Sequence, residues 1–297
     1  MEEVTGVKDK IFAYLQLMRF ANVFTAMADV LAGYLIVFGA QIRFRDLLAL
    51  LLSSSCVYAG GCVLNDLRDR EIDARERPFR PLPSGRVSAR EALWLLFILF
   101  GGGLLASYPV GASSALVTAF LIVLVVSYNM LAKHMDVAGP LNMGACRALN
   151  LILGASPGIL LMGHGWPFPF ISLAYVFSLT VLSRFEVSGA PANKRWIVLV
   201  GWTGVVALLA GMVAAGGLSQ EAVAYVCVFA ALTGLPLAKG LFDPKAVLVR
   251  KAVKALILGI PLLDAVYVSG AQGWELGVPV ALCIVPAVFV SRYLYVT

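Results

Sequence analysis

The sequence predicts an all-α integral membrane protein built from nine to ten transmembrane helices, and three observations support this. The 297 residues are 60% hydrophobic and 13% charged, with a mean hydropathy of +0.88, whereas a soluble domain is about one-quarter charged. The apolar residues form long continuous runs, unlike the short alternating segments of an outer-membrane barrel. Lysine and arginine are concentrated in alternate loops, a bias that reports membrane topology. These observations exclude a soluble globule, a disordered chain and a disulfide scaffold.

Ten apolar runs approach the roughly 20 residues that a helix needs to cross a bilayer. They leave no room for a separate soluble domain, so residues 1–297 are predicted to form one polytopic domain. The first run lacks a cleavage signature and is predicted to be an anchor helix. In chain order the runs are Phe20–Ala40, Leu47–Leu64, Leu93–Ser107, Ser113–Leu131, Leu141–Met162, Phe168–Leu182, Trp196–Ala215, Ala222–Ala238, Ala252–Val268 and Leu276–Tyr293.

The basic residues distinguish the two sides of this bundle. The N-terminal segment and the even-numbered loops hold nearly all of them, and the odd-numbered loops hold only Arg43 and Arg45. The net charge of +6 therefore reports topology, and no nucleic-acid partner is expected. Ten crossings with both termini inside satisfy the positive-inside bias. We predict a multi-pass cell-membrane protein whose termini and active-site loops face the cytoplasm.

The segment Asn65–Asp73 carries the clearest chemical signal. It reads Asn-Asp-Leu-Arg-Asp-Arg-Glu-Ile-Asp. If the second helix continues through it, at about 100° per residue, then Asn65, Asp66, Asp69 and Asp73 share one quarter of the helix surface. Three like charges on one face repel each other, and a divalent cation offsets that cost. Oxygen ligands favour Mg²⁺, Mn²⁺ or Ca²⁺ over zinc, and Mg²⁺ completes its shell with water and substrate phosphate oxygens. We predict that these four residues bind such a divalent cation.

Two alternatives remain for this region. The acidic segment can be a solvated helix end neutralised by arginines, with Asp69 paired to Arg70, although the shared phase of the aspartates favours the metal site. The loop that follows, Arg77-Pro78-Phe79-Arg80-Pro81-Leu82-Pro83-Ser84-Gly85-Arg86, cannot be helical because of its prolines. Arg77 and Arg80 offer forked donors for phosphate oxygens, but the loop can instead touch anionic lipid headgroups. Residues 65–90 thus form an Asp-rich motif followed by a basic loop.

These motifs resemble the UbiA superfamily of intramembrane prenyltransferases. The likeness rests on Asn65-Asp66-x-x-Asp69-x-x-x-Asp73 followed by an Arg-Pro-Leu-Pro-x-Gly-like stretch. It implies helices around a central cavity, ionisation of an allylic prenyl diphosphate on Mg²⁺, and transfer of the prenyl group to an aromatic or other lipophilic acceptor. The family's Tyr-x-x-x-Lys-like motif is matched by Tyr128 and Lys133, with one extra residue between them. Lys133 is then expected to grip the diphosphate.

The second acidic motif of that superfamily is incomplete here. Where an Asp-x-x-x-Asp motif is expected after the sixth helix, Leu182–Gly189 offers only one carboxylate, Glu186. The Ser-Arg-x-Glu-Val pattern, with the opening stretch Arg19–Asp29, resembles the UbiA-like EboC group. Arg184 stands where a metal ligand is expected, and one hypothesis is that its charge substitutes for a missing ion.

Several polar residues lie at membrane depth, where they are rare and face inward. The pair Arg147 and Asn150, together with Asn22 and Glu186, is predicted to line the cavity and orient the acceptor's polar end. Asp29 and Asp264 either join this role or pair with polar neighbours to hold helices together.

The resulting prediction is a Mg²⁺-dependent membrane prenyltransferase, with a prenyl diphosphate, a lipophilic or aromatic acceptor and membrane lipids as partners. Its catalytic residues are Asp66, Asp69, Asp73 and Lys133. The alternative is a catalytically degenerate relative that binds or transports a lipophilic precursor, which the incomplete second motif favours. A CDP-alcohol phosphotransferase is discounted because no Asp-Gly follows Asp66. The predicted substrate-binding residues are Asn22, Asn65, Arg77, Arg80, Tyr128, Arg147, Asn150, Arg184 and Glu186.

Overall fold

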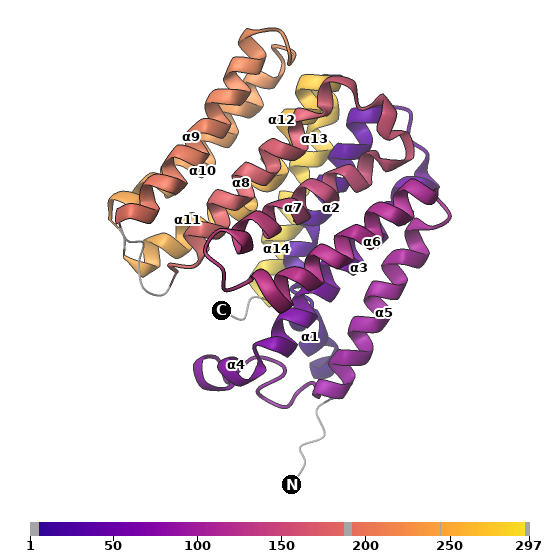
Figure 1. The fold of residues 1–297 in the computed structure, drawn as a ribbon, viewed down its shortest axis with the longest axis vertical. Coiled ribbons are helices and arrows are strands. Elements are labelled where there is room, and N and C mark those ends of the chain that lie inside the picture. The colour runs from indigo at the N-terminus through magenta and orange to yellow at the C-terminus, as the bar shows by residue number, and fades with distance from the viewer. Residues whose placement is uncertain (1–5, 187–191, 244, 295–297) are drawn as a thin grey trace.

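A computed structural model describes residues 6–186, 192–243 and 245–294, and every regular element in these ranges is helical. The helices form a single bundle (Figure 1), which confirms the predicted all-α class. Nine helices of the described chain are long and apolar enough to cross a membrane: Phe20–Phe38, Phe44–Arg68, Ala89–Ser107, Ala112–Ala132, Ala138–Leu161, Gly163–Ser183, Lys194–Ala214, Ala222–Phe242 and Trp274–Leu294.

Some of these spans are divided by local changes of helix type. The elements in chain order are α1 (Val7–Leu17), α2 (Phe20–Phe38), α3 (Phe44–Arg68), α4 (Arg70–Glu76), α5 (Ala89–Ser107), α6 (Ala112–Ser127), the π-helix η1 (Tyr128–Ala132), α7 (Ala138–Ala155), the 3₁₀ turns η2 (Ser156–Leu161) and η3 (Gly163–Gly165), α8 (Pro167–Ser183), α9 (Ala192–Ala214), α10 (Ala222–Phe242), α11 (Ala246–Leu258), α12 (Ile260–Gln272), α13 (Trp274–Leu282) and α14 (Ile284–Leu294).

The ninth predicted run, Ala252–Val268, falls on two successive helices. α11 and α12 have 13 residues each and meet at Gly259. The backbone bonds of Gly259 to Ala255 (2.8 Å) and of Leu263 to Gly259 (2.9 Å) continue through the junction. At 1.5 Å per residue, the pair is about 39 Å long. Together these helices are long enough for a tenth crossing, which accounts for the predicted range of nine to ten.

The centre of the bundle is formed by α2 and α12. Every residue of α12 from Ile260 to Gly270 is buried, and α2 packs against α3, α7, α12 and α14. The contact between α2 and α7 is backbone to backbone. A Cβ at Gly33 would lie 2.0 Å from the Leu151 carbonyl oxygen, and one at Gly154 would lie 2.0 Å from that of Val30. Glycine is therefore required at both positions.

One end of the bundle carries α1, α4 and the basic loop (Figure 1). α14 contacts α1 there, so the described ends of the chain lie near each other. α5 begins at a capping box in which Ser88 and Glu91 bond each other's backbone N–H groups, and Lys10 of α1 lies 2.5 Å from Glu91. The predicted functional residues of the even-numbered loops meet at this end.

Candidate functional site

The Asp-rich motif is bent at Asp69. α3 ends at Arg68 and α4 begins at Arg70, with Asp69 at φ −86° and ψ 1° between them. The expectation of one straight helix through Asp73 is therefore wrong. The backbone bonds Asp69 to Asn65 (3.0 Å) and Asp73 to Asp69 (2.8 Å) persist, but α4 turns away from the axis of α3 (Figure 1). The residues of α4 are mostly charged and do not continue the apolar span of α3. Asp73 therefore lies beyond the bend.

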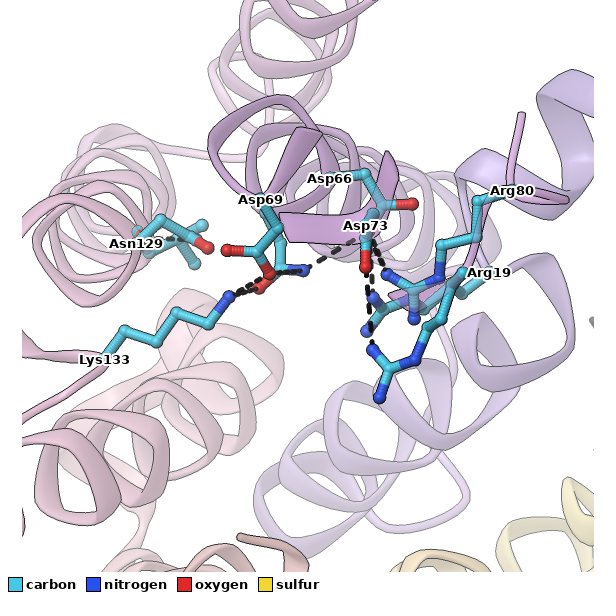
Figure 2. A network of polar contacts seen from close by, with 10 residues as sticks. Arg19, Asp66, Asp69, Asp73, Arg80, Asn129 and Lys133 are labelled. Carbon is cyan, nitrogen blue, oxygen red and sulfur yellow. Dashed lines mark hydrogen bonds and ion pairs between the residues drawn. The ribbon is translucent and has the colours of Figure 1, made fainter. Parts of the chain in front are cut away.

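Asp66 and Asp73 are joined through an arginine of the basic loop. Arg80 Nη1 lies 2.7 Å from Asp73 Oδ2 and 3.5 Å from Asp66 Oδ1. Arg77 is 3.7 Å from Asp73, and Arg19 Nη2 donates to Asp66 Oδ1 over 3.0 Å. Both carboxylates are buried, and their charges are offset by these cations (Figure 2). Burial without such partners would be costly.

Asp69 is held by a different cation. Lys133 Nζ donates to Asp69 Oδ2 and, over 2.8 Å, to Asn65 Oδ1. Asn65 Nδ2 in turn donates to Asp69 Oδ2 (3.2 Å) and Asp66 Oδ1 (3.3 Å). Asn65 thus connects Asp66 and Asp69. Among the described residues no three Asp, Glu, His or Cys side chains are grouped so that they could hold one metal ion. The prediction of three aspartates facing one ion is not realised in this arrangement.

The extra residue between Tyr128 and Lys133 is absorbed by a π-helical turn. η1 begins at Tyr128, and the Lys133 N–H bonds the Tyr128 carbonyl over 2.9 Å, an i to i+5 bond. Residues five apart are nearly in line in a π-helix but not in an α-helix, and such turns are frequent at functional sites. The longer spacing therefore still lets Tyr128 line the cavity while Lys133 reaches Asp69.

A cavity of about 330 Å³ opens beside this network. Its walls are largely apolar, with Val57, Leu121, Val176 and Ile257 among them. Of the predicted substrate-binding residues, six line it: Asn22, Asn65, Tyr128, Arg147, Asn150 and Glu186. The others, Arg77, Arg80 and Arg184, lie in the polar network outside the lining.

Sequence reasoning did not assign six polar lining residues: Arg19, Ser54, Tyr58, Asn129, Thr180 and Ser183. Asn129 precedes Lys133 by four residues inside an apolar run, a spacing that could have identified it. Arg19 has φ 48° and ψ 48°, the only positive φ of a non-glycine residue in the described chain. Such backbone strain costs on the order of 1–3 kcal/mol. Here it accompanies a guanidinium bonded to Asp66.

Arg147 and Asn150 belong to a buried polar cluster on the cavity wall. Arg147 donates to Asp29 Oδ2 (2.9 Å) and Thr25 Oγ1 (2.8 Å). Asn150 donates to Asp29 Oδ2 and to the Ala26 carbonyl, both over 2.8 Å. These bonds tie α2 to α7, so Asp29 takes the helix-pairing role. Asp264 of α12 is equally buried, but neither of its carboxyl oxygens has a hydrogen-bond donor among the described residues.

Arg184 and Glu186 lie at the end of α8. The Arg184 guanidinium donates to the backbone carbonyls of Lys133 (2.9 Å) and Met135 (2.7 Å) and lies 3.3 Å from Asp136. Its donors therefore hold the turn that carries Lys133, and it does not line the cavity as a free cation. Glu186 does line the cavity. Burial raises the pKa of Glu186, against the opposing charges of Arg77, Arg250 and Arg19. The predicted EboC-like stretch continues into residues 187–191, which lie outside the described chain.

The arrangement suits capture of an anionic head by an apolar cavity. Three cations, Arg19, Arg80 and Lys133, lie at its mouth next to the carboxylates of Asp66 and Asp69. Cations alone would bind an anion, and carboxylate and amide oxygens alone would bind a hard divalent cation. Their combination fits a phosphate group together with its metal ion.

The sequence model of the UbiA prenyltransferase family matches residues 26–233 of the chain. Relatives include digeranylgeranylglyceryl phosphate synthase of Sulfolobus acidocaldarius, 34% identical over 178 residues, or 60% of this chain and 62% of that protein. The synthase of the same name from Methanopyrus kandleri is 28% identical over 266 residues, or 89% of this chain and 91% of that one. The match to the Sulfolobus protein thus spans about three-fifths of its length.

Solved structures show the same fold. A digeranylgeranylglyceryl phosphate synthase structure has a TM-score of 0.66 and 22% identity, covering 89% of this chain and 99% of that one. A UbiA homologue from Archaeoglobus fulgidus bound to GPP and Mg²⁺ has a TM-score of 0.53 and 13% identity, covering 91% and 99%. At these identities the likeness is one of fold.

Proposed function

Because the chain belongs to the UbiA prenyltransferase family, we propose that it is a membrane prenyltransferase that moves an isoprenoid group from an allylic prenyl diphosphate to an aromatic or other lipophilic acceptor, with Mg²⁺ as cofactor. One observation carries the proposal: Asp66 and Asp69, which pair with Arg80 and Lys133, are bonded to Asn65, and Asn65 lines an apolar cavity. This joins a polar head site to a site for a hydrocarbon chain. The isoprenoid chain would enter the cavity from the surrounding membrane lipids.

The charges at the mouth account for how the diphosphate would leave. A diphosphate carries a charge near −3, and it leaves readily only when its developing charge is neutralised. Mg²⁺, when bound, supplies part of that neutralisation as a Lewis acid. We assign its binding to Asn65, Asp66 and Asp69, since Asn65 Nδ2 donates hydrogen bonds to both carboxylates and so holds them together. Asp73, predicted as a fourth ligand, is instead assigned to anchoring Arg80, since that ion pair is 2.7 Å long and buried on the Asp73 side.

The basic residues then take the remaining charge. Lys133 and Arg80 are bonded to carboxylates in the described structure. Phosphate oxygens compete for the same donors, and charge-assisted bonds of this kind are among the strongest in proteins. We infer that the two side chains exchange carboxylate for phosphate when the donor substrate binds. Arg77, which is more exposed and only loosely paired, would extend this capture into the basic loop.

The acceptor is assigned to the polar side of the cavity. Asn22, Tyr128, Arg147 and Asn150 line it, with Glu186 at its edge. The allylic cation formed there would be shielded from water by the apolar wall. The relatives' name, digeranylgeranylglyceryl phosphate synthase, supports an acceptor that carries a glyceryl phosphate head, and the Arg147 guanidinium suits such a head. Membership of the EboC group remains a prediction.

Orientation follows from the charge pattern. The loops that carry Asp69, Lys133 and Arg184 meet at one end of the bundle. Because these loops hold most of the basic residues, we propose that this end and both termini face the cytoplasm of a cell membrane.

The test is release of diphosphate by the purified full-length protein. Labelled prenyl diphosphates of several chain lengths are incubated with the protein and Mg²⁺. We expect Asp69→Asn to lower the rate by about 100-fold or more, because a transition-state charge loses its stabiliser. Asp46→Asn, in the first turn of the same helix, is the matched control and should retain the wild-type rate. If the wild type binds the donor without releasing diphosphate under any of these conditions, the chain is a carrier of lipophilic precursors.

A further inference from the structure

Asn129 presents an oxygen without a partner inside the candidate site. Its side chain is 8% exposed, it lines the cavity, and its Oδ1 has no hydrogen-bond donor among the described residues. A buried acceptor left in this state costs about 1–3 kcal/mol, and such groups in native structures mark a ligand, ion or water. The amide nitrogen of Asn129 is hydrogen-bonded, so the side chain that carries this unpaired oxygen has a defined orientation.

The orientation of this amide is fixed by its other half. Asn129 Nδ2 donates to the Val125 carbonyl over 2.9 Å. A carbonyl only accepts hydrogen bonds, so a flipped amide would place two acceptors against each other. Oδ1 must therefore face away from Val125, and Figure 2 shows it directed toward the side of Asp69.

Asp69 presents acceptors to the same region. Its hydrogen bonds with Lys133 and Asn65 both end on Oδ2, and its side chain is 18% exposed. Two acceptors that face a common space cannot bond each other, but one cation satisfies both. Amide and carboxylate oxygens are the hard ligands that Mg²⁺ and related divalent ions take. We propose that Asn129 supplies its amide oxygen to the divalent cation bound by Asp69. This rests on the proposed function and adds a ligand from the π-turn η1.

The π-turn η1 would then position two groups of the site. Asn129 and Lys133 both come from the end of the α6–η1 span and both face Asp69 (Figure 2). The span would therefore deliver an oxygen for the cation and an ammonium group for the phosphate. It would also compensate in part for the missing acidic motif after α8, where Glu186 is the only carboxylate in the described part.

The experiment measures binding of Mn²⁺, as a probe for Mg²⁺, by the loss of its free EPR signal. The purified full-length protein is used with an unreactive prenyl thiolodiphosphate. Asn129→Ala should raise the Mn²⁺ Kd about 10-fold, at the lower end of the effect of disturbing a metal site. Asn129→Asp keeps an oxygen for the cation but loses the hydrogen bond to the Val125 carbonyl, so it should bind Mn²⁺ more tightly than Asn129→Ala. Asn142→Ala is the matched control, because Asn142 bonds Ser127 and does not line the cavity.

Two results would overturn the proposal. One is an unchanged Mn²⁺ Kd in Asn129→Ala where Asp69→Asn raises it, which would assign the oxygen to water or to the acceptor. The other is equal weakening in Asn129→Ala and Asn129→Asp, which would trace the loss to the hydrogen bond between Asn129 Nδ2 and the Val125 carbonyl. Because the readout is binding, it is independent of turnover. Asn129-dependent Mn²⁺ binding without diphosphate release would retain this proposal and reject the enzyme, whereas release without the dependence would do the opposite.

Discussion

Arg184 donates a hydrogen bond of 2.9 Å to the backbone carbonyl of Lys133. A side chain at the end of α8 thus fixes the turn after η1 that places the Lys133 ammonium against Asp69. A Cβ at Gly139 would lie 2.5 Å from this guanidinium, so the adjoining helix leaves room for it. Arg184 therefore acts on the site through the backbone that carries Lys133, and not as a free charge in place of an ion.

Replacement of Arg184 should misplace Lys133 without removing any ligand. We expect Arg184→Ala to lower kcat/KM for the prenyl diphosphate about 10- to 100-fold, because small displacements of a binding group have effects of this size. The Mn²⁺ Kd should stay unchanged. Asp136→Asn is the control, since Asp136 is exposed and such surface pairs contribute little. Wild-type kinetics in Arg184→Ala would show that the Lys133 turn holds its place unaided.

The ion pair between Asp73 and Arg80 should stabilise the basic loop. Asp73→Asn leaves the Arg80 guanidinium, which is 15% exposed, without its short partner. Breaking one side of a buried pair costs about 3–5 kcal/mol, so we expect a loss of about 3 kcal/mol in unfolding free energy, measured by denaturant in detergent. The Mn²⁺ Kd should change far less than in Asp69→Asn. An equal rise in Kd in the two variants would restore Asp73 as a metal ligand.

Asp264 should be replaceable with a gain in stability. Its buried oxygens have no donor among the described residues, and an uncompensated buried carboxyl is unfavourable. Asn in its place has nearly the same volume and no ionisable group, and we expect about 1–2 kcal/mol of added stability, read as a higher Tm. Asp29→Asn should do the reverse, because Asp29 accepts from Arg147 and Asn150. A lower Tm in Asp264→Asn would reveal a required negative charge at that position.

Glu186 should make stability depend on pH. Burial raises its pKa above the ordinary 4.5, so the folded state favours the protonated form. Its contribution to stability is fully present below pH 4.5 and is lost as the pH rises through the raised pKa. We expect the difference in Tm between Glu186→Gln and the wild type to grow in favour of the variant across this window. If the Tm curves of Glu186→Gln and the wild type stay parallel as the pH changes, the positive charges of Arg77 and Arg250 cancel the effect of burial on the Glu186 pKa.

Part of the site could be read from sequence because its signals are local. The polar Asn65–Asp73 segment follows an apolar run, and the prolines after Arg77 exclude helix. Residues such as Arg147 and Asn150 are conspicuous inside apolar runs, and both do line the cavity. Asp264 is just as conspicuous, yet no residue within 6–186, 192–243 and 245–294 donates to its oxygens.

The bend at Asp69 could not be predicted from such local signals in the sequence. Helical phase alone predicted that Asp73 shares a face with Asp69, since an uninterrupted helix is the simplest continuation of an apolar run. Asp69 pairs with Lys133 and Asp73 pairs with Arg80. Both partners lie outside the Asn65–Asp73 segment. Local periodicity contains no information about such partners.

By itself the sequence determined the membrane class, the position of the helical spans and the clustering of charge in alternate loops. These depend on hydrophobic transfer and on the lengths of apolar runs, which are properties of neighbouring residues. Only the tertiary structure decided that Arg80 joins Asp66 to Asp73, that Arg184 holds the Lys133 turn, and that the Asn129 oxygen has no partner in the described part of the chain. Such pairings depend on which helices pack together at close range, because charge–charge and hydrogen-bond energies act over a few ångströms between residues far apart in the chain.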